Sequence, residues 1–321
     1  MANKSWQFLN PGNIVDIIAP SSSIPNVDLL EYYQKVKQIL ASIGLIARIP
    51  DNLIVLGEDS FSANSLKYRA DHIINAFNNN ESKAIWAIRG GYGAAKLIPF
   101  LEKIAEPIQP KLLLGFSDIT ALHLFLNNKW HWSSIHSPVI NGLITNPKSI
   151  DELKPILFGE QKNITYNQLT PLNNYAKNSQ DIEGEIIGGN LCLVQTSLAA
   201  SWQIDTRNKI VFLEEVDERG YRIDRMLNHL LQAGVFKDAK AVIFGQIIPG
   251  YEKDGANLCE IAIENFIESL DIPVLSLSTI GHNGYLNSPL PFGAICHLSL
   301  GDQPVLVCSS GGANFYENEV C

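Results

Sequence analysis

The sequence predicts an α/β fold with two domains, and three observations support this prediction. Strand and helix signals alternate along most of the chain. The strand signals are short and almost continuously apolar, which is typical of parallel sheets that helices cover on both faces. The length of 321 residues also suggests two domains, because a domain commonly holds about 100–200 residues.

The first half of the chain shows the alternation most clearly. Residues 13–20 form an apolar run that ends at Pro20 and predicts a buried strand. Between Asp28 and Ile43 the apolar side chains recur at helical spacing, and Gly44 follows where a helix C-cap is expected. The same reasoning predicts a helix over 62–77, strands over 84–88 and 111–116, and a helix over 118–127.

Residues 145–181 separate the two halves, because Asn, Gln, Pro, Ser and Thr dominate there and the periodicity is weak. We therefore expect an N-terminal α/β domain over 1–148, an interdomain connection over 149–182 and a C-terminal β/α domain over 183–321. In the C-terminal part the patterns predict strands over 209–213, 239–246 and 273–279, helices over 221–235 and 257–270, and a β-hairpin over 296–308.

The composition excludes several classes of protein. Apolar residues make up 46% and charged residues 18% of the chain, which is ordinary for a globular protein. The net charge of −9 argues against nucleic acid or an anionic membrane surface as the main partner. No uninterrupted apolar run reaches the roughly 20 residues of a membrane-spanning helix. The first residues lack the apolar segment of a secretory signal, so we expect a cytoplasmic protein.

The sequence gives little support for a metal or disulfide site. Its five cysteines are odd in number and widely spaced, with no C-x-x-C pair, which indicates reduced thiols. No H-E-x-x-H motif is present, so metal-dependent hydrolysis is the weaker interpretation. We expect no metal site.

A glycine-rich loop, Gly90-Gly91-Tyr92-Gly93, follows one predicted strand. It lacks the third glycine and the later acidic residue of a dinucleotide fingerprint, and the chain has no P-loop. Consecutive glycines still allow backbone N–H groups to approach a ligand closely. The loop therefore indicates a backbone-lined pocket more than a nucleotide site.

Ser117 lies between an apolar strand and a helix. Such a serine projects from the carboxyl edge of a sheet beside the N–H groups of a helix start, which is the arrangement of a nucleophile elbow. The pattern G-x-S-x-G is incomplete, because Ile119 stands at the second glycine position. Helix capping by Ser117 or Asp118 is the alternative, and the pattern leaves both open.

A serine nucleophile needs a base and a group that orients the base. His282 is the best-placed histidine, because it leaves an apolar strand into a glycine-flanked loop, and His136 at another strand exit is the second candidate. Glu214 follows a buried strand, where a carboxylate is costly unless it is exposed or paired. A surface cluster of charges over 214–218 is the alternative. Glu215 competes with Glu214, because strand parity leaves open which of them faces the site.

Several blocks of sequence resemble, in order, those of the LD-carboxypeptidase family, the serine peptidases of the muramoyltetrapeptide carboxypeptidase and microcin-immunity type. The blocks are residues 18–22, 87–93, 115–120, 183–191, 212–215 and 281–282. Singly they are weak, but together they span nearly the whole chain. The resemblance implies a flavodoxin-like N-terminal domain with a parallel sheet, a swivelling C-terminal β/α domain and a homodimer.

The resemblance also implies a catalytic triad of Ser117, Glu214 and His282. The nucleophile then comes from the N-terminal domain and both partners from the C-terminal domain, which places the site at the interdomain cleft, a usual location for a binding site. Family spacing favours Glu214 over Glu215 as the residue that orients His282.

Further site residues follow from the same resemblance. The backbone N–H groups of Gly91 and Asp118 are the implied oxyanion donors, with Gly90 as the alternative to Gly91. Arg89 is a candidate for binding the terminal carboxylate of the substrate, and a structural ion pair is its alternative role. The implied chemistry requires no cofactor.

The implied activity is removal of the terminal D-alanine from murein tetrapeptides in peptidoglycan recycling. A murein peptide is then the expected partner. One alternative is a microcin-type self-immunity hydrolase that cleaves acyl-sulfamoyl or peptidyl-nucleotide bonds, with Trp130, Trp132 or Trp202 as an aromatic platform. Another is a two-domain binding protein without catalysis. Two departures, Ser137 in the family's His-Gly-Pro and Ala200-Ser201 in place of Gly-Thr, are expected to alter the substrate pocket.

Overall fold

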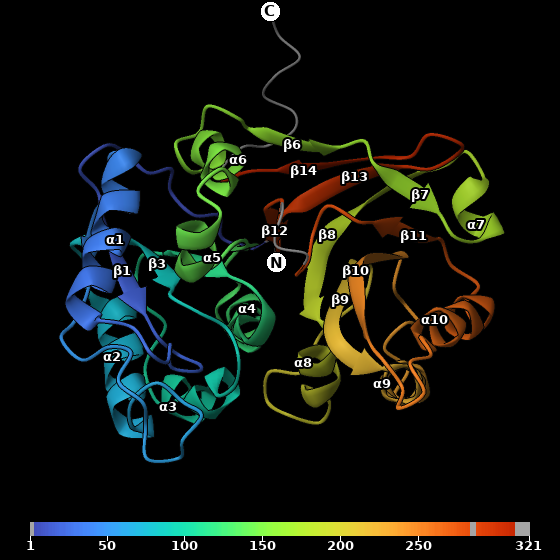
Figure 1. The fold of residues 1–321 in the computed structure, drawn as a ribbon. Helices are drawn as coiled ribbons and strands as arrows, with labels where there is room; N and C mark the ends of the chain where they lie inside the picture. Colours follow the sequence, from blue (N-terminus) through green and yellow to red (C-terminus); the bar gives the residue numbers. More distant parts are fainter. Residues whose placement is uncertain (1–2, 283–286, 312–321) are drawn as a thin grey trace, which may run out of the picture.

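The computed structural model describes residues 3–282 and 287–311, which form two sheets that lie side by side (Figure 1). The first sheet has the strand order β12-β5-β4-β3-β1-β2. Its strands are β1 (Ile14–Ile18), β2 (Ile46–Arg48), β3 (Ser82–Ala87), β4 (Leu112–Gly115), β5 (Ser134–His136) and β12 (Leu290–Phe292). All neighbours pair in parallel except the edge strand β12. Without β12, this is the order of flavodoxin-like sheets, so the predicted parallel α/β fold is confirmed.

The second sheet contains eight described strands in the order β6-β14-β13-β8-β9-β10-β11-β7. They are β6 (Asn163–Tyr166), β7 (Leu169–Pro171), β8 (Asp181–Asn190), β9 (Ile210–Arg219), β10 (Ala241–Gly250), β11 (Val274–Leu277), β13 (Ile295–Ser299) and β14 (Val305–Ser309). The four central strands β8 to β11 are parallel, and β13 and β14 form the predicted hairpin. The stretch over 149–182 supplies both edge strands, β6 and β7, which are short and carry few apolar residues, so their pattern is weak in the sequence.

Helices surround both sheets. The α-helices among the described residues are α1 (Leu29–Ser42), α2 (Leu66–Asn78), α3 (Ile98–Leu101), α4 (Thr120–Phe125), α5 (Ile140–Thr145), α6 (Ser149–Leu157), α7 (Asn174–Lys177), α8 (Leu191–Thr196), α9 (Gly220–Gln232) and α10 (Cys259–Glu268). The helix predicted over 118–127 is divided into a 3₁₀ turn, α4 and a π turn. No helix of residues 3–282 and 287–311 is long and apolar enough to cross a membrane.

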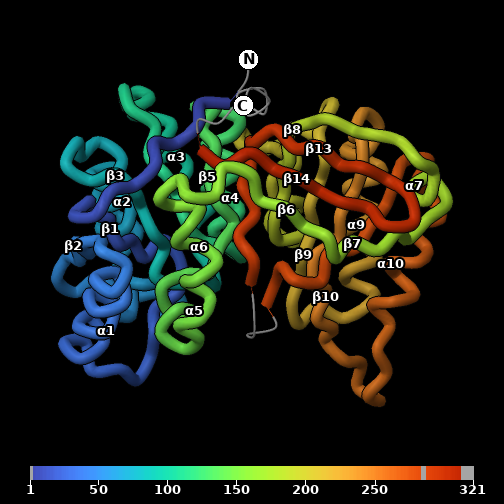
Figure 2. The backbone as a smooth tube through the Cα atoms, turned by 90° about the horizontal axis from the view of Figure 1, so that it is seen from above, coloured from blue at the N-terminus to red at the C-terminus, as the bar shows by residue number. Residues whose placement is uncertain are grey.

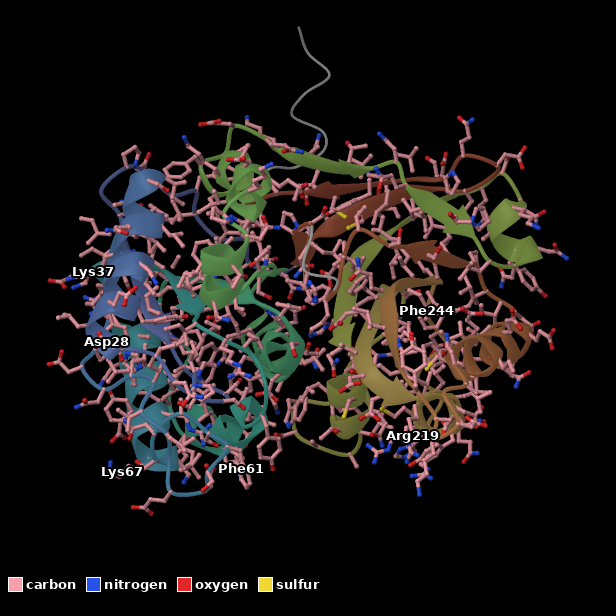
Figure 3. The ribbon with its side chains drawn as sticks, in the orientation of Figure 1. Asp28, Lys37, Phe61, Lys67, Arg219 and Phe244 are labelled. Carbon is pink, nitrogen blue, oxygen red and sulfur yellow. The ribbon has the colours of Figure 1, made fainter. Side chains whose placement is uncertain are left out.

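The core lies on both faces of the two sheets. Alternate residues of β9 belong to different apolar clusters, Ile210 and Phe212 to one and Val211 and Leu213 to the other. The strands of the first sheet divide in the same way, so each cluster continues from one half of the molecule into the other. Figure 3 shows Lys37 and Lys67 at the outer rim and Phe244 inside the second half.

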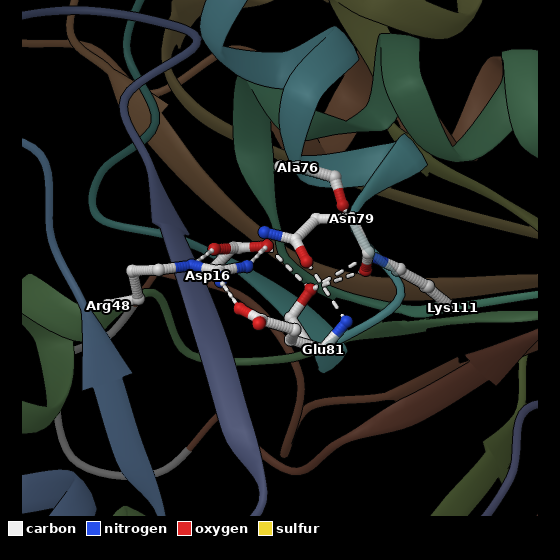
Figure 4. A network of polar contacts seen from close by, with 7 residues as sticks. Asp16, Arg48, Ala76, Asn79, Glu81 and Lys111 are labelled. Atoms are coloured by element: carbon white, nitrogen blue, oxygen red, sulfur yellow. Dashed lines mark hydrogen bonds and ion pairs between the residues drawn. The ribbon is translucent and has the colours of Figure 1, made fainter.

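A buried polar network fixes the amino ends of the central strands of the first sheet (Figure 4). Arg48 contacts both carboxylate oxygens of Asp16, at 2.5 and 2.8 Å, and Ser82 donates to the same carboxylate at 2.6 Å. Lys111 donates to Ser82 and to the Ala76 carbonyl at the end of α2. Burial lowers the pKa of Lys111 to about 8. The network lies at the end of the sheet opposite Ser117, since Ser82 begins β3 and Ser117 follows β4.

Two glycines near the end of β8 allow close packing, Gly188 against the neighbouring strand β9 and Gly189 against α4, which follows Ser117. Gly188 and Gly189 end β8 with φ of +144° and +130°. A Cβ at Gly188 would lie 1.9 Å from the Phe212 carbonyl oxygen, and one at Gly189 would lie 2.4 Å from Oγ1 of Thr120 in α4. The same hydroxyl accepts a hydrogen bond from Asn190 N–H. Only glycine permits approaches this close. The contact of Gly189 with α4 joins the two halves of the molecule, which lie next to each other in the view from above (Figure 2).

Candidate active site

Three loops meet at the carboxyl edge of the first sheet. They follow β1, β3 and β4, and β1 and β3 are neighbours whose connections run in opposite directions, which is where ligands bind in such sheets. Ser117 begins the loop after β4 with a φ of +64°, a strained value that is found at functional turns. A Cβ at Gly90 would lie 3.2 Å from Ser117 Oγ. The glycine of the β3 loop therefore lets its backbone reach the serine.

Asp118 connects these loops through its side chain. Its Oδ2 accepts hydrogen bonds from Ser21 Oγ at 2.6 Å and from Ala94 N–H at 2.8 Å. Burial raises the pKa of Asp118, although these hydrogen bonds and Arg69 oppose the change. No side-chain cap is formed at the helical turns that begin at Ser117 and Thr120. The carboxylate thus holds the loops together and does not serve as a helix cap.

The loop after β3 carries the candidate oxyanion donor Gly91. Its φ is +114°, and a Cβ there would lie 2.4 Å from Ser22 Oγ. That hydroxyl accepts a hydrogen bond from Tyr92 N–H, and Ser22 N–H donates to the Gly90 carbonyl. The glycines thus pack the β1 and β3 loops against each other, and this packing requires no nucleotide.

Glu214 lies inside a strand and not at its end, which corrects the strand bounds inferred from sequence. Strand β9 continues to Arg219 because it pairs with β8 and β10 beyond residue 213. The strand alternation places Glu214 on the face of Phe212 and Glu215 on the face of Leu213. The two carboxylates therefore point to opposite sides of the sheet.

Glu214 and His282 form a buried pair. Glu214 is wholly buried, and its Oε2 lies 2.8 Å from Nδ1 of His282. Burial raises the pKa of Glu214, but His136 and His282 outweigh burial and hold its pKa at about 2. Burial lowers the pKa of His282, but Glu214 raises it more, so the net shift is upward. An ionised carboxylate thus fixes the imidazole with Nδ1 toward Glu214.

Glu215 has different partners. It accepts hydrogen bonds from Asn190 Nδ2 at 2.8 Å, Cys192 N–H at 2.8 Å and Val216 N–H at 2.9 Å. Burial and the charge of Glu214 raise its pKa to about 7 against the effect of these donors. Because Cys192 lies in the first turn of α8, Glu215 serves to hold that helix against β9.

His136 lies on the other side of Glu214. Its side chain is wholly buried, and its Nε2 is 3.9 Å from Glu214 Oε1. Phe116, Phe212 and Phe292 surround the imidazole with ring centroids 5.5 to 5.6 Å away. The second candidate for the base thus lies beside the Glu214–His282 pair.

A cavity of about 90 Å³ lies beside His282. Phe116, Pro138 and Asn146 line it together with His282 and Asn287. The Phe116 ring, one residue before Ser117, packs 4.6 Å from the His282 ring. Gly281 N–H donates to Asn287 Oδ1, which fixes the turn before His282. The segment after His282, residues 283–286, lies outside the described residues.

Arg89 donates a hydrogen bond from Nη1 to the Ser23 carbonyl at 2.5 Å. Within the described part of the chain, no carboxylate oxygen lies within 4.0 Å of its guanidinium. The alternative of a structural ion pair is therefore not observed. Trp130, Trp132 and Trp202 are at most 6% exposed and pack in the core. They form no aromatic platform.

Some functional positions gave no signal in the sequence. Arg69 lies near the start of α2, yet it is buried and donates to the Pro20 and Gly93 carbonyls of two site loops. Ser21 binds Asp118 across 97 positions of the chain. No group of three or more His, Cys, Asp or Glu side chains suited to a metal occurs among residues 3–282 and 287–311. Four cysteines are free thiols, and Cys321 lies outside the described residues.

Comparison with known proteins supports the assignment of family. The model of the LD-carboxypeptidase N-terminal domain matches residues 15–137, and that of the C-terminal domain matches residues 183–298. The chain is 39% identical to a putative carboxypeptidase of Rickettsia conorii, over 86% of this chain and 84% of that protein. It is 29% identical to a probable murein peptide carboxypeptidase of Bacillus subtilis, over 87% of both chains.

Two solved structures share the fold. A muramoyltetrapeptide carboxypeptidase from Oxalobacter formigenes aligns with a TM-score of 0.74 and 23% identity, over 94% of this chain and 100% of the other. An MccF-like protein from Bacillus anthracis aligns with a TM-score of 0.77 and 20% identity, over 95% and 99%. The chain belongs to the LD-carboxypeptidase family and is a serine carboxypeptidase, a hydrolase.

Proposed function

We propose that the protein is an LD-carboxypeptidase that releases the terminal D-alanine from murein tetrapeptides. The observation that carries the proposal is the buried Glu214–His282 hydrogen bond of 2.8 Å, beside the loop that presents Ser117 at a left-handed φ. The murein peptide carboxypeptidase named among the relatives supports the substrate class.

The proposed reaction proceeds through an acyl-enzyme. Ser117 Oγ attacks the carbonyl carbon of the amide that precedes D-alanine, and Nε2 of His282 takes the serine proton. Glu214 stabilises the imidazolium. The N–H groups of Gly91 and Asp118 stabilise the oxyanion, a large contribution in such reactions. His282 then protonates the leaving amine as the C–N bond breaks, and water hydrolyses the ester.

Arg89 is the proposed ligand of the substrate's terminal carboxylate. Its guanidinium has one hydrogen bond, to a backbone carbonyl, and no carboxylate partner among the residues described here. A guanidinium binds a carboxylate with two parallel hydrogen bonds, which a lysine ammonium does not provide. Arg89→Lys is therefore expected to raise KM for the tetrapeptide more than it lowers kcat.

The decisive experiment is incubation with a murein tetrapeptide, followed by mass spectrometry for the loss of one alanine. An all-L analogue is the matched control. We expect release of alanine from the tetrapeptide and much slower cleavage of the analogue. Equal rates on both peptides would indicate a general carboxypeptidase. No reaction of Ser117 with a fluorophosphonate, together with no release of alanine, would favour a binding protein.

A microcin-type immunity hydrolase is the second candidate, because the MccF-like structure shares the fold. An acyl-sulfamoyl nucleoside in the same assay tests it. We expect slower cleavage than with the tetrapeptide, since the three tryptophans considered as a nucleotide platform are buried. Faster cleavage would reverse the order of the two proposals.

Cytoplasmic peptidoglycan recycling and a homodimer complete the proposal. Both remain predictions. Cell fractionation tests the location, and recovery of the native protein mainly outside the cytoplasmic membrane would contradict it. Light scattering of the purified chain tests the dimer, and a mass of 35.5 kDa, that of one chain, would contradict it.

A further inference from the structure

His136 and Glu214 leave three polar atoms without partners inside the protein. Both ring nitrogens of His136 and Oε1 of Glu214 lack a hydrogen-bond partner, and both side chains are 0% exposed. A buried polar atom without a partner costs roughly 1–3 kcal/mol. Such atoms are rare enough in folded proteins that each one calls for an explanation.

The nearest partner of each group is the other one. His136 Nε2 lies 3.9 Å from Glu214 Oε1, so a movement of about 1 Å brings them to ordinary hydrogen-bond distance. The neutral tautomer with the proton on Nε2 then leaves only a lone pair on Nδ1 unmatched. Three phenylalanine rings hold the imidazole on its other sides.

No other charged group competes for His136 within the part of the chain that the structure describes. The loop after β4 presents Phe116 near it, β5 presents Ser134 and β12 presents Phe292, and β9 presents Phe212 and Glu214. From α4, His123 is the other titratable neighbour. It is neutral, because burial lowers its pKa to about 3, and its nitrogens bind Ser134 Oγ and the Gly115 carbonyl.

We propose that His136 is a positioning residue that donates its Nε2–H to Oε1 of Glu214 and so controls the proton affinity of His282. The carboxylate then lies between two imidazoles, with Oε2 on His282 and Oε1 on His136. A donor on Oε1 withdraws part of the carboxylate charge and weakens its attraction for the proton on His282. The base is therefore neutral at a lower pH than it would be beside a carboxylate that binds only one histidine.

The catalytic consequence of this role rests on the proposed function, whereas the hydrogen bond between His136 and Glu214 does not. His136→Phe removes the donor and keeps an aromatic ring, and His136→Gln restores a neutral N–H donor. Phe292→Leu is the matched control, because it disturbs the same apolar surroundings without changing a donor.

The first measurement is an NMR titration of ¹⁵N-histidine-labelled resting enzyme, with His282→Ala to assign the signal. We expect the His282 midpoint to move up by about one pH unit in His136→Phe, a usual size for histidine shifts. His136→Gln and Phe292→Leu should stay near the wild-type midpoint. An unchanged midpoint in a folded His136→Phe protein would overturn the proposal.

The second measurement is the pH dependence of kcat/KM for D-alanine release. We expect His136→Phe to lower kcat about 10- to 100-fold with little change in KM, the scale found for outer partners that orient a metal-binding histidine. Its acid limb should move to higher pH, and His136→Gln should recover most of both. Equal damage in both variants would mean that packing matters and the donor does not. If the wild-type protein releases no alanine, the proposed function fails, while the NMR titration still decides the role of His136.

Discussion

The loop that carries Ser117 and the strand that carries Glu214 differ in how their buried carboxylates are satisfied. Asp118 Oδ2 accepts two hydrogen bonds from neighbouring loops. Glu214 accepts one, from His282, and its second oxygen has no partner. A carboxylate with its partners filled fixes geometry. A carboxylate with one free oxygen beside a histidine can take up a further hydrogen bond, which we assign to His136.

Ser117→Ala is expected to have the largest effect, because it removes the proposed nucleophile, which lies next to Asp118 in the chain. Turnover should fall on the order of 10⁴–10⁶-fold, as with members of serine triads. Alanine keeps the Cβ, so thermal unfolding should be nearly unchanged. The rate of D-alanine release and the unfolding midpoint are the measurements. Turnover close to that of the wild type would remove Ser117 from the mechanism.

Glu214→Gln and Glu215→Gln compare two adjacent buried carboxylates on opposite faces of β9. Glu214→Gln should lower kcat about 10³- to 10⁴-fold, because the amide favours the wrong tautomer of His282 and does not stabilise imidazolium. Glu215→Gln should keep kcat within about threefold at pH 8, because an amide oxygen can still accept from Cys192 N–H. Steady-state kinetics decide between them, and the reverse order would assign the orienting role to Glu215.

Asp118→Ala tests whether the loops around Ser117 depend on filled hydrogen bonds. It leaves Ser21 Oγ and Ala94 N–H without their acceptor, which costs about 1–3 kcal/mol of unfolding free energy. Turnover should fall about 10²-fold, because the loop shifts and displaces the backbone N–H of residue 118, a proposed oxyanion donor.

Asp28→Ala is the control for this stability loss. It removes the N-cap of α1, where the carboxylate accepts from Glu31 N–H, at a cost of about 1 kcal/mol. Urea unfolding and kinetics of both variants separate stability from positioning. Equal activity of the two variants would show that Asp118 contributes stability alone.

Sequence patterns predict the three central strands of the parallel half, β1, β3 and β4, because each contains an apolar run between turn residues. They failed where pairing extends a strand beyond its apolar residues. Strand β9 continues through Glu214 to Arg219 because β8 and β10 flank it. The edge strands β6 and β7 are short and carry few apolar residues, so the sequence pattern predicts a connection over this stretch and no strand.

The residues of the candidate site also differ in how well the sequence predicts them. Ser117 at its turn carried a local signal, and the family resemblance added Glu214 and His282. The contacts of Arg69 and Ser21 join segments far apart in the chain, and no local pattern specifies such contacts. Glu214 and Glu215 differ only by strand parity, which became meaningful once the strand bounds were known.

The pH dependence of kcat/KM gives the smallest effect and the finest test of the contrast between Glu214 and Glu215. The pKa of His282 is raised above its usual 6.5 by Glu214 and, to a lesser degree, by Glu215. Activity requires neutral His282, so kcat/KM should fall as the pH drops through a value above 6.5. The pKa of Glu215 is about 7, so its carboxylate also changes its charge near neutral pH in the wild-type enzyme.

Glu215→Gln separates the two ionisations. It removes a negative charge that favours imidazolium, so the acid limb should move down by a few tenths of a pH unit and follow a single ionisation. His229→Gln is the control and should leave the limb unchanged, because His229 lies on the exposed face of α9, where its ring contacts Gln195 of α8. An upward movement of the acid limb in Glu215→Gln would contradict this prediction, because the loss of a nearby negative charge by itself weakens proton binding by His282. Such a result would mean that Glu215 acts on the site through α8 and not through its charge.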